Sequence, residues 1–209
     1  MNNSNIVCIA LAIALSVVTW LYVKTPAQSA EESENAANQA YDCIISRASC
    51  RSFTDSLVSE AAIDSLLKAA MASPSACDQR VWQFVVITDS EVLDSIASKC
   101  KNMRPVAKAP MAIAVCADME LAPDSPGHPF WVQDVSAATE NLLLAAHSMG
   151  LGAVWCGCYP IDDLMGNIRQ ILELPATVMP LNVIAIGYPD VQLNVKDKFD
   201  RTRIHYNSY

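Results

Sequence analysis

The chain has 209 residues, of which 52% are apolar and 17% are charged, and its formal net charge at pH 7 is −8. This composition is sufficient for a packed core and excludes an intrinsically disordered chain. The acidic balance excludes a general electrostatic attraction to nucleic acid or anionic lipid, so we expect no nucleic-acid partner. Basic residues that cluster in such a chain require a local explanation.

The N-terminus forms a separate segment. Residues 6–23 are 18 residues without a charged side chain, and they end in Trp20 and Tyr22, aromatic residues that favour a membrane interface. A helix of this length reaches about 27 Å, just enough to span a bilayer. The preceding residues lack Lys and Arg, which is atypical of a signal peptide, although residues 27–29 offer a cleavage site. We therefore predict a membrane anchor or signal segment over residues 1–24, and a membrane-anchored or exported domain whose orientation is open.

Residues 25–38 are polar and acidic, and we interpret them as a tether to a single domain over residues 39–209. Of the eight cysteines in the chain, seven fall in this domain, and no two of them form a C-x-x-C pair. The three histidines are isolated from one another. This spacing predicts no metal site.

Hydrophobic periodicity predicts helices and strands along most of the domain. The predicted helices start at Ser59 and end before Pro74, start at Asp89–Ser90, and span Phe130–Met149 and Ile161–Leu172. The predicted strands are Trp82–Thr88, Met111–Ala117, Ala153–Cys156 and Leu181–Ile186. The last segment, Tyr188–Tyr209, has little periodicity. This order favours a three-layer α/β or α+β domain over a β-sandwich or a helical bundle.

The first motif with chemical meaning is R-A-S-C-R at residues 47–51. In an extended stretch, residues i, i+2 and i+4 point to the same side, so Arg47, Ser49 and Arg51 could converge on one anion. Arginine suits a phosphate because its planar guanidinium donates two parallel hydrogen bonds. Taken alone, the motif is more typical of a solvated basic turn.

The second motif is the stretch S-P-S-A-C-D-Q-R-V-W-Q-F at residues 73–84, which joins a helix to a strand. Its small residues Pro74, Ser75 and Ala76 allow the backbone to approach a flat ligand, with amides and a hydroxyl available for hydrogen bonds. By itself, such a stretch is more typical of a plain connection.

Two further motifs lie later in the chain. Gly157 stands between Cys156 and Cys158 where a predicted strand ends. A catalytic dithiol is conceivable there, but a Cys-x-Cys disulfide is strained, so small side chains packing around a ligand are favoured. Lys196 and Lys198 belong to a charged stretch which, taken alone, indicates a basic tail.

In this order the motifs resemble those of the FMN-dependent nitroreductase family. The resemblance covers about residues 41–209 and rests on R-x-S-x-R at 47–51, P-S-A at 74–76, Q-D-x-S-A-A-T-x-N-L-L-L-A-A-H at 133–147 and K-x-K-F-D at 196–200. It implies a nitroreductase-like α+β fold, a three-layer sandwich in which helices flank a central mixed β-sheet, with an extended C-terminal tail. It also implies an intertwined homodimer with FMN at the subunit interfaces.

The resemblance assigns cofactor contacts to particular positions. Phosphate and ribityl contacts would come from Arg47, Ala48, Ser49 and Arg51, and from Lys196 and Lys198 of the tail. The residues beside the flavin ring would be Pro74, Ser75, Ala76, Asp78 and Arg80. The backbone N–H of Gly157, flanked by Cys156 and Cys158, would face the flavin N5 atom.

The resemblance also implies the chemistry. NADH or NADPH reduces FMN, and a nitroaromatic, quinone or similar small acceptor takes the electrons in a second half-reaction. Because the flavin carries the reaction, no side chain is assigned as catalytic. Two alternatives remain: a flavin-dependent reductive dehalogenase, and a flavin-binding protein without turnover.

The chain departs from the family pattern at the loop after Ala76. Asp78 replaces the usual Asn, Arg80 the usual Gln and Val81 the usual Pro. An ionised Asp only accepts hydrogen bonds, whereas Asn also donates. A carboxylate beside the ring would lower the potential of FMN, and we expect Arg80 to offset it by pairing with Asp78 or by donating to the flavin.

Overall fold

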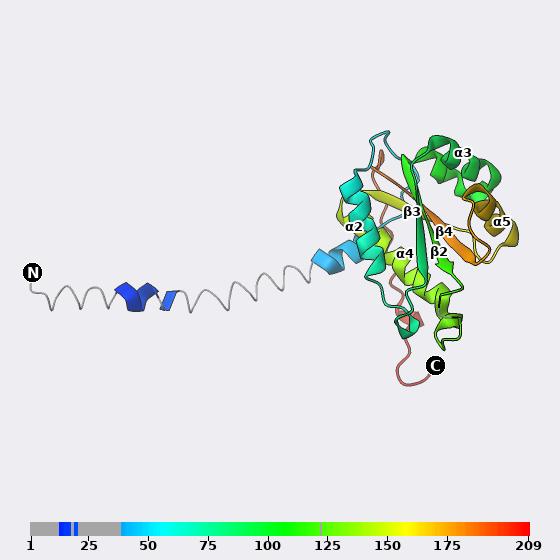
Figure 1. Ribbon diagram of the computed structural model, residues 1–209. Coiled ribbons are helices and arrows are strands. Elements are labelled where there is room, and N and C mark those ends of the chain that lie inside the picture. Colours follow the sequence, from blue (N-terminus) through cyan, green and yellow to red (C-terminus); the bar gives the residue numbers. More distant parts are fainter. Residues whose placement is uncertain (1–12, 18, 21–38, 122) are drawn as a thin grey trace, which may run out of the picture. The chain divides into compact units, whose positions relative to one another are not determined.

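The computed structural model describes residues 13–17, 19–20, 39–121 and 123–209 (Figure 1). Most of the predicted membrane or signal segment, and the tether over residues 25–38, lie outside the described residues. Among the residues that are described, no helix combines the length and hydrophobicity needed to cross a bilayer. Contacts divide the chain into two units, Met1–Ile45 and Ser46–Tyr209, and a helix over residues 39–46 runs across their boundary.

The second unit is built on one sheet of four strands, in the order β1-β2-β4-β3. The strands are β1 (Trp82–Ile87), β2 (Met111–Asp118), β3 (Gly152–Gly157) and β4 (Val178–Gly187). All neighbouring strands pair antiparallel. The parallel component of the expected mixed sheet is an isolated bridge between Ser49 and Ala153, on the free edge of β3.

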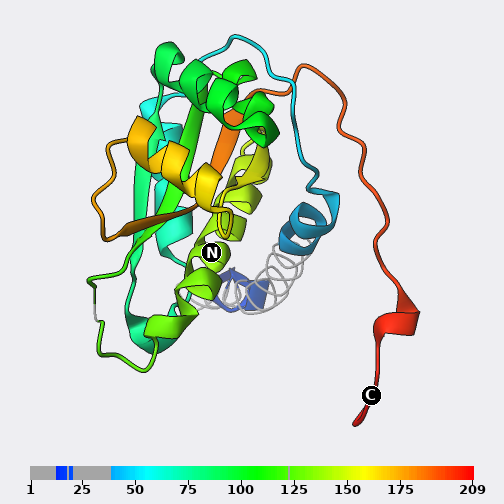
Figure 2. The same cartoon turned by 90° about the vertical axis from the view of Figure 1, so that its right-hand side faces the viewer.

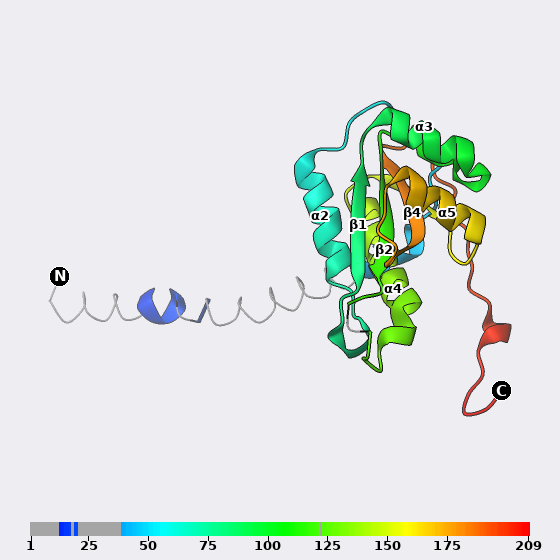
Figure 3. The same cartoon turned by 45° about the vertical axis from the view of Figure 1, so that its right-hand side comes forward.

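Helices cover both faces of this sheet, which confirms the predicted three-layer α+β fold (Figure 3). The helices are α2 (Glu60–Met71), α3 (Ser90–Lys99), α4 (Trp131–Ser148) and α5 (Asp162–Ile171). One core cluster joins the sheet to α2 and α4, and a second joins its other face to α3 and α5. The helix α4 buries residues along most of its length, as its largely apolar sequence predicts.

Local chemistry starts two of these helices where the sequence predicts. The Ser59 hydroxyl accepts from the Ala62 N–H at the start of α2, and the Asp89 carboxylate accepts from the Glu91 N–H at the start of α3. The described residues also contain four 3-10 helices that were not predicted: η1 (Ala76–Asp78), η2 (Lys101–Lys108), η3 (His128–Phe130) and η4 (Arg201–Arg203). Three of them are too short to show a hydrophobic period, and η2 contains Pro105, which predicts a helix break.

The tail after β4 leaves the sheet as an extended segment. Figure 2 shows it in orange and red, running clear of the helices toward the C-terminus. Several of its apolar side chains are exposed: Val191, Val195, Phe199, Ile204 and Tyr206. Exposed apolar side chains that lie close together are typical of interaction surfaces.

Candidate functional site

The segment over residues 46–51 lies against α4. The Ser46 hydroxyl is 2.8 Å from Nε2 of His147, and Nε of Arg47 donates to Oε1 of Glu140 at 3.1 Å. Glu140 and His147 are seven residues apart, so they lie on the same side of α4. One predicted anion ligand, Arg47, is therefore already oriented by an acidic side chain that the sequence did not single out.

The same segment also pairs with the edge of the sheet. The Cys50 N–H donates to the Ala153 carbonyl at 3.0 Å, beside the bridge between Ser49 and Ala153. The approach is close, because a Cβ atom on Gly152 would lie 2.6 Å from Cβ of Cys50. Cys50 is buried while Ser49 and Arg51 are exposed, the alternation expected of an extended stretch.

Gly157 ends the edge strand β3, and the ladder fixes where its backbone groups point. Gly157 pairs with Asn182, and the next residue, Cys158, donates its N–H to Leu181 of β4 at 3.0 Å. Residues of an antiparallel pair alternate between facing their partner strand and facing away. The N–H and C=O of Gly157 therefore face the open edge of the sheet, the edge on which Ser49 and Cys50 lie.

Two side chains flank this glycine. Nδ2 of Asn102, at the start of η2, donates to the Gly157 carbonyl at 2.8 Å. The indole of Trp155 is also close, with Nε1 3.7 Å from where a Cβ of Gly157 would be. Sequence reasoning missed both residues. The available sequence signal for Trp155 was a large aromatic residue two positions before Gly157, whereas Asn102 has none.

The cysteines on either side of Gly157 point away from that edge. Cys156 and Cys158 belong to the core cluster under α3 and α5. Burial raises the pKa of Cys156 to about 11 and that of Cys158 to about 12, although the nearby positive charge of Arg51 acts to lower the pKa of Cys156. Both are free thiols that stay protonated at neutral pH, which argues against the catalytic dithiol. By the same alternation, the backbone groups of Cys156 and Cys158 face β4, and the Cys158 N–H already donates to Leu181, so the structure does not place these two cysteines as ligands at the open edge.

The stretch after α2 forms a strained lip, by which we mean residues 74–80. Cys77, Asp78 and Arg80 have φ values of 53°, 54° and 53°, in the left-handed region that non-glycine residues rarely adopt. The Arg80 N–H donates to the Ser75 hydroxyl at 3.0 Å, which closes the turn. Strain of this kind persists where the surroundings hold it, and it is frequent at ligand sites.

A hydrogen bond to α4 fixes the lip. The Ala76 N–H donates to Oδ1 of Asp134 at 2.9 Å, and the Asp134 side chain is buried. Oδ2 of Asp134 has no hydrogen-bond partner in the described part of the chain. A second contact comes from the loop before α4, since a Cβ on Gly127 would lie 2.7 Å from the Ala76 carbonyl oxygen. An acid in an apolar helix was the sequence signal for Asp134.

At the tip of the lip, Asp78 and Arg80 form a two-pronged ion pair. Nε of Arg80 is 2.8 Å from Oδ1 of Asp78, and Nη2 is 2.7 Å from Oδ2. The hydrogen bond from Arg80 holds the pKa of the Asp78 carboxyl below its usual range. The predicted pairing of these two residues is confirmed, so Asp78 is ionised at neutral pH.

The tail lysines are not brought to the other predicted ligands within this chain. Lys196 and Lys198 are exposed, and no hydrogen bond or ion pair joins them to residues 47–51 in the described structure. Their part of the tail runs clear of the domain (Figure 2). A single chain therefore presents only part of the predicted site.

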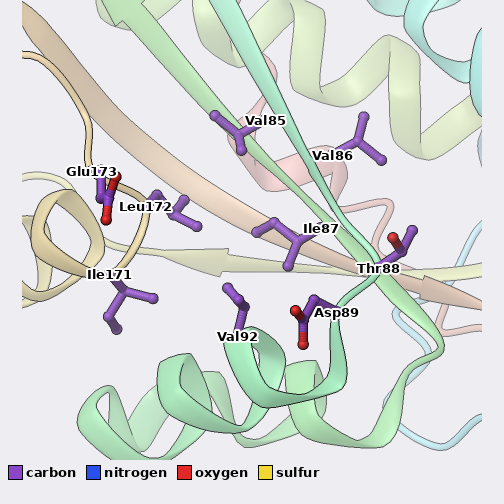
Figure 4. Close-up of a pocket in the computed structure, with 9 residues that line it drawn as sticks. All are labelled: Val85, Val86, Ile87, Thr88, Asp89, Val92, Ile171, Leu172 and Glu173. Carbon is purple, nitrogen blue, oxygen red and sulfur yellow. The ribbon is translucent and has the colours of Figure 1, made fainter.

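Three pockets formed by described residues lie elsewhere. The one in Figure 4, of about 290 Å³, has apolar walls from β1, α3 and the end of α5, with Asp89 and Glu173 beside them. Another, of about 550 Å³, lies beside Asn102 and includes Lys99 and Lys101. A third, of about 330 Å³, lies around Pro110. None of these three contains a predicted site residue.

Comparison with known proteins gives one consistent result. The family model described as "Nitroreductase family" matches residues 44–118 and 99–188. A proposed NADH dehydrogenase/NAD(P)H nitroreductase of Methanothermobacter thermautotrophicus is 45% identical over 168 residues, which are 80% of this chain and 86% of that protein.

Solved structures agree with this match. A proposed NADH dehydrogenase/NAD(P)H nitroreductase of Parabacteroides distasonis superposes with a TM-score of 0.78 at 41% identity, covering 82% of this chain and 99% of its own. An FMN-dependent nitroreductase of Clostridium difficile gives a TM-score of 0.74 at 28% identity, covering 81% and 99%.

Proposed function

The chain belongs to the nitroreductase family, and from this premise we propose that it is an NAD(P)H-dependent FMN oxidoreductase that reduces nitroaromatic, quinone or similar small acceptors. The observation that carries the proposal is the outward-facing N–H of Gly157, on the same edge of the sheet as Ser49 and Cys50. One edge thus offers a hydrogen-bond donor for a flavin ring near a segment rich in phosphate ligands.

The residues present fit FMN. Arg47, Ser49 and Arg51 supply two guanidinium groups and a hydroxyl for a phosphate and its ribityl chain. The Gly157 N–H is a donor that no strand partner occupies, which suits the N5 acceptor of an oxidised flavin. The lip adds Ser75 and Ala76, whose small side chains permit close approach of the ring.

Bound FMN supplies the two-electron redox chemistry, and the chain's residues orient it and set its electrostatic surroundings. The Gly157 N–H holds one edge of the ring, and the Asp78–Arg80 pair places a charged group at the lip. No side chain is assigned as an acid or base, since the buried thiols of Cys156 and Cys158 do not face this edge.

The active form, in this proposal, is a homodimer with FMN at the interface. Two observations support it: the partial site on one chain, and the exposed apolar side chains of the tail, Val191, Val195, Phe199, Ile204 and Tyr206. Burying these side chains against a partner would stabilise the dimer and carry Lys196 and Lys198 into a phosphate site.

Membrane association through residues 1–24 is part of the proposal, and it raises the question of the electron donor. Free NAD(P)H is scarce outside the cytoplasm, so the domain either faces inward or takes electrons from another redox protein or a quinol. A reporter fused after Tyr209, read out on both sides of the membrane, distinguishes these topologies.

The decisive experiment uses the purified full chain. We expect a flavin absorption spectrum, release of FMN on denaturation, bleaching by NADH or NADPH, and reoxidation by a nitroarene or quinone. Release of iodide from an iodinated phenol in place of nitroarene turnover would favour a reductive dehalogenase. A bound flavin that neither nicotinamide bleaches would instead indicate another donor or a protein without turnover.

A further inference from the structure

Arg47 does not stand alone at the predicted phosphate site, because its side chain is bonded to Glu140 of α4. The Nε–Oε1 distance is 3.1 Å, and the side chain of Arg47 is 19% exposed while that of Glu140 is 46% exposed. We propose that Glu140 is a positioning residue, which orients the Arg47 guanidinium toward the FMN phosphate. The inference rests on the proposed function, and it adds a residue that the family resemblance does not assign.

The geometry of the guanidinium supports this role. Arginine carries five N–H donors in one plane, of which the Nε–H lies on one edge and the terminal Nη groups on the other. Glu140 bonds to Nε, so the terminal Nη groups stay available for a second, two-pronged interaction. That interaction is the one in which arginine binds phosphate most strongly.

The backbone around Arg47 is fastened on both sides. Before it, the Ser46 hydroxyl is 2.8 Å from Nε2 of His147 on α4, and after it, the Cys50 N–H bonds to Ala153 of β3 at 3.0 Å. The remaining freedom of Arg47 lies in its long side chain, whose rotamer entropy is large. Glu140 removes much of that freedom before the ligand arrives, which lowers the entropic cost of binding.

Glu140 has two opposing effects on phosphate affinity. Its hydrogen bond orients Arg47, which strengthens binding, whereas its negative charge repels the phosphate, which weakens binding. Glu140→Gln keeps an oxygen that can accept from Nε but removes the charge. Glu140→Ala removes both. The two variants carry the same net charge, so a difference between them reports the orienting hydrogen bond.

The experiment measures dissociation constants of FMN and of riboflavin, which lacks the phosphate, for the full chain stripped of flavin. We expect E140A to bind FMN about tenfold more weakly than E140Q, as expected for one lost bond to a charged group. The difference should vanish for riboflavin, and also when both variants carry Arg47→Ala. The matched control is Glu91→Gln on α3, which removes one charge on the other face of the sheet.

The experiment distinguishes failure of this inference from failure of the proposed function. Equal FMN affinities for E140A and E140Q in a chain that binds FMN overturn this inference and leave the proposed function intact. A difference that persists with riboflavin, or without Arg47, also overturns it, because Glu140 would then act on something other than the phosphate. Absence of FMN binding by the unmodified chain overturns the proposed function and this inference together.

Discussion

Arg80 donates two parallel hydrogen bonds to Asp78, from Nε at 2.8 Å and from Nη2 at 2.7 Å, within a turn in which both residues have positive φ. The pair places an ionised carboxylate and its counter-ion at the lip of the proposed flavin site. Each residue replaces an uncharged one in the family pattern. The lip is therefore where this chain's flavin should differ electronically from that of its relatives.

Asp78→Asn should raise the midpoint potential of bound FMN. A carboxylate near the ring opposes the negative charge of the reduced cofactor, and Arg80 compensates this only in part, so we expect a rise on the order of 10–30 mV. Arg80→Gln, which leaves the carboxylate without its cation, should lower the potential. The measurement is a redox titration against dyes of known potential, with Asp94→Asn of α3 as control. An unchanged or lower potential for Asp78→Asn contradicts the argument.

Gly157→Pro tests the donor that carries the proposed function. Proline removes the N–H, and it is tolerated on an edge strand where that N–H faces away from the ladder. We expect FMN affinity to fall about tenfold, the effect of one lost hydrogen bond to a ligand. Gly157→Ala is the matched control, since its Cβ would have 3.7 Å to Nε1 of Trp155 and its N–H remains. If the two variants bind FMN equally, the Gly157 N–H is not a flavin ligand.

Local chemistry made much of this fold predictable. Ser59 and Asp89 accept hydrogen bonds from backbone groups a few residues away, so the sequence alone locates the starts of α2 and α3. Alternation likewise places Cys156 of β3, and Cys158 directly after it, on one face of the sheet. Whether that face is buried depends on α3 and α5, which cover it and lie elsewhere in the sequence. The burial of Cys156 and Cys158 was therefore not predictable.

In the candidate site, too, local features could be predicted from the sequence, whereas contacts between distant segments could not. The spacing at 47–51 together with the family resemblance predicts phosphate ligands there, but the partner of Arg47 is 93 residues away on α4. Asn102, which donates to the Gly157 carbonyl, lies at the start of a 3-10 helix that contains Pro105, a residue that predicts a helix break. Contacts between segments so distant in sequence arise from the packing of whole elements, and no local pattern encodes them.

Replacing Asp134 should release the lip from α4. Its Oδ1 accepts from the Ala76 N–H at 2.9 Å inside the core, so Asp134→Ala leaves that N–H without its acceptor and should cost about 2–3 kcal/mol of stability. Asp134→Asn retains an oxygen acceptor and should cost about 1 kcal/mol or less. Urea unfolding measures both, and proteolysis at residues 77–80 reports opening of the lip. Equal losses for the two variants would show that the Ala76 bond is not the cause.

Buried thiols should make the folded domain unstable in alkali. Burial raises the pKa of Cys116 from 9.0 to about 12, and it also raises the pKa values of Cys156 and Cys158. Above pH 9 the unfolded chain loses these protons while the folded chain retains them. The contribution of these protonated thiols to the free energy of unfolding is therefore complete below pH 9. It is lost progressively as the pH rises toward the pKa values of the folded state.

For Cys116 alone, this linkage amounts to about 2 kcal/mol between pH 8 and pH 10.5, at 1.36 kcal/mol per unit of pH. Urea unfolding at the two pH values should show a smaller loss for Cys116→Ala than for the unmodified chain, even though the cavity lowers its stability at both. Cys77→Ala is the control, because it removes an exposed thiol and leaves the buried ones in place. An identical pH dependence for Cys116→Ala and the unmodified chain would mean that Cys116 ionises alike in the folded and unfolded states.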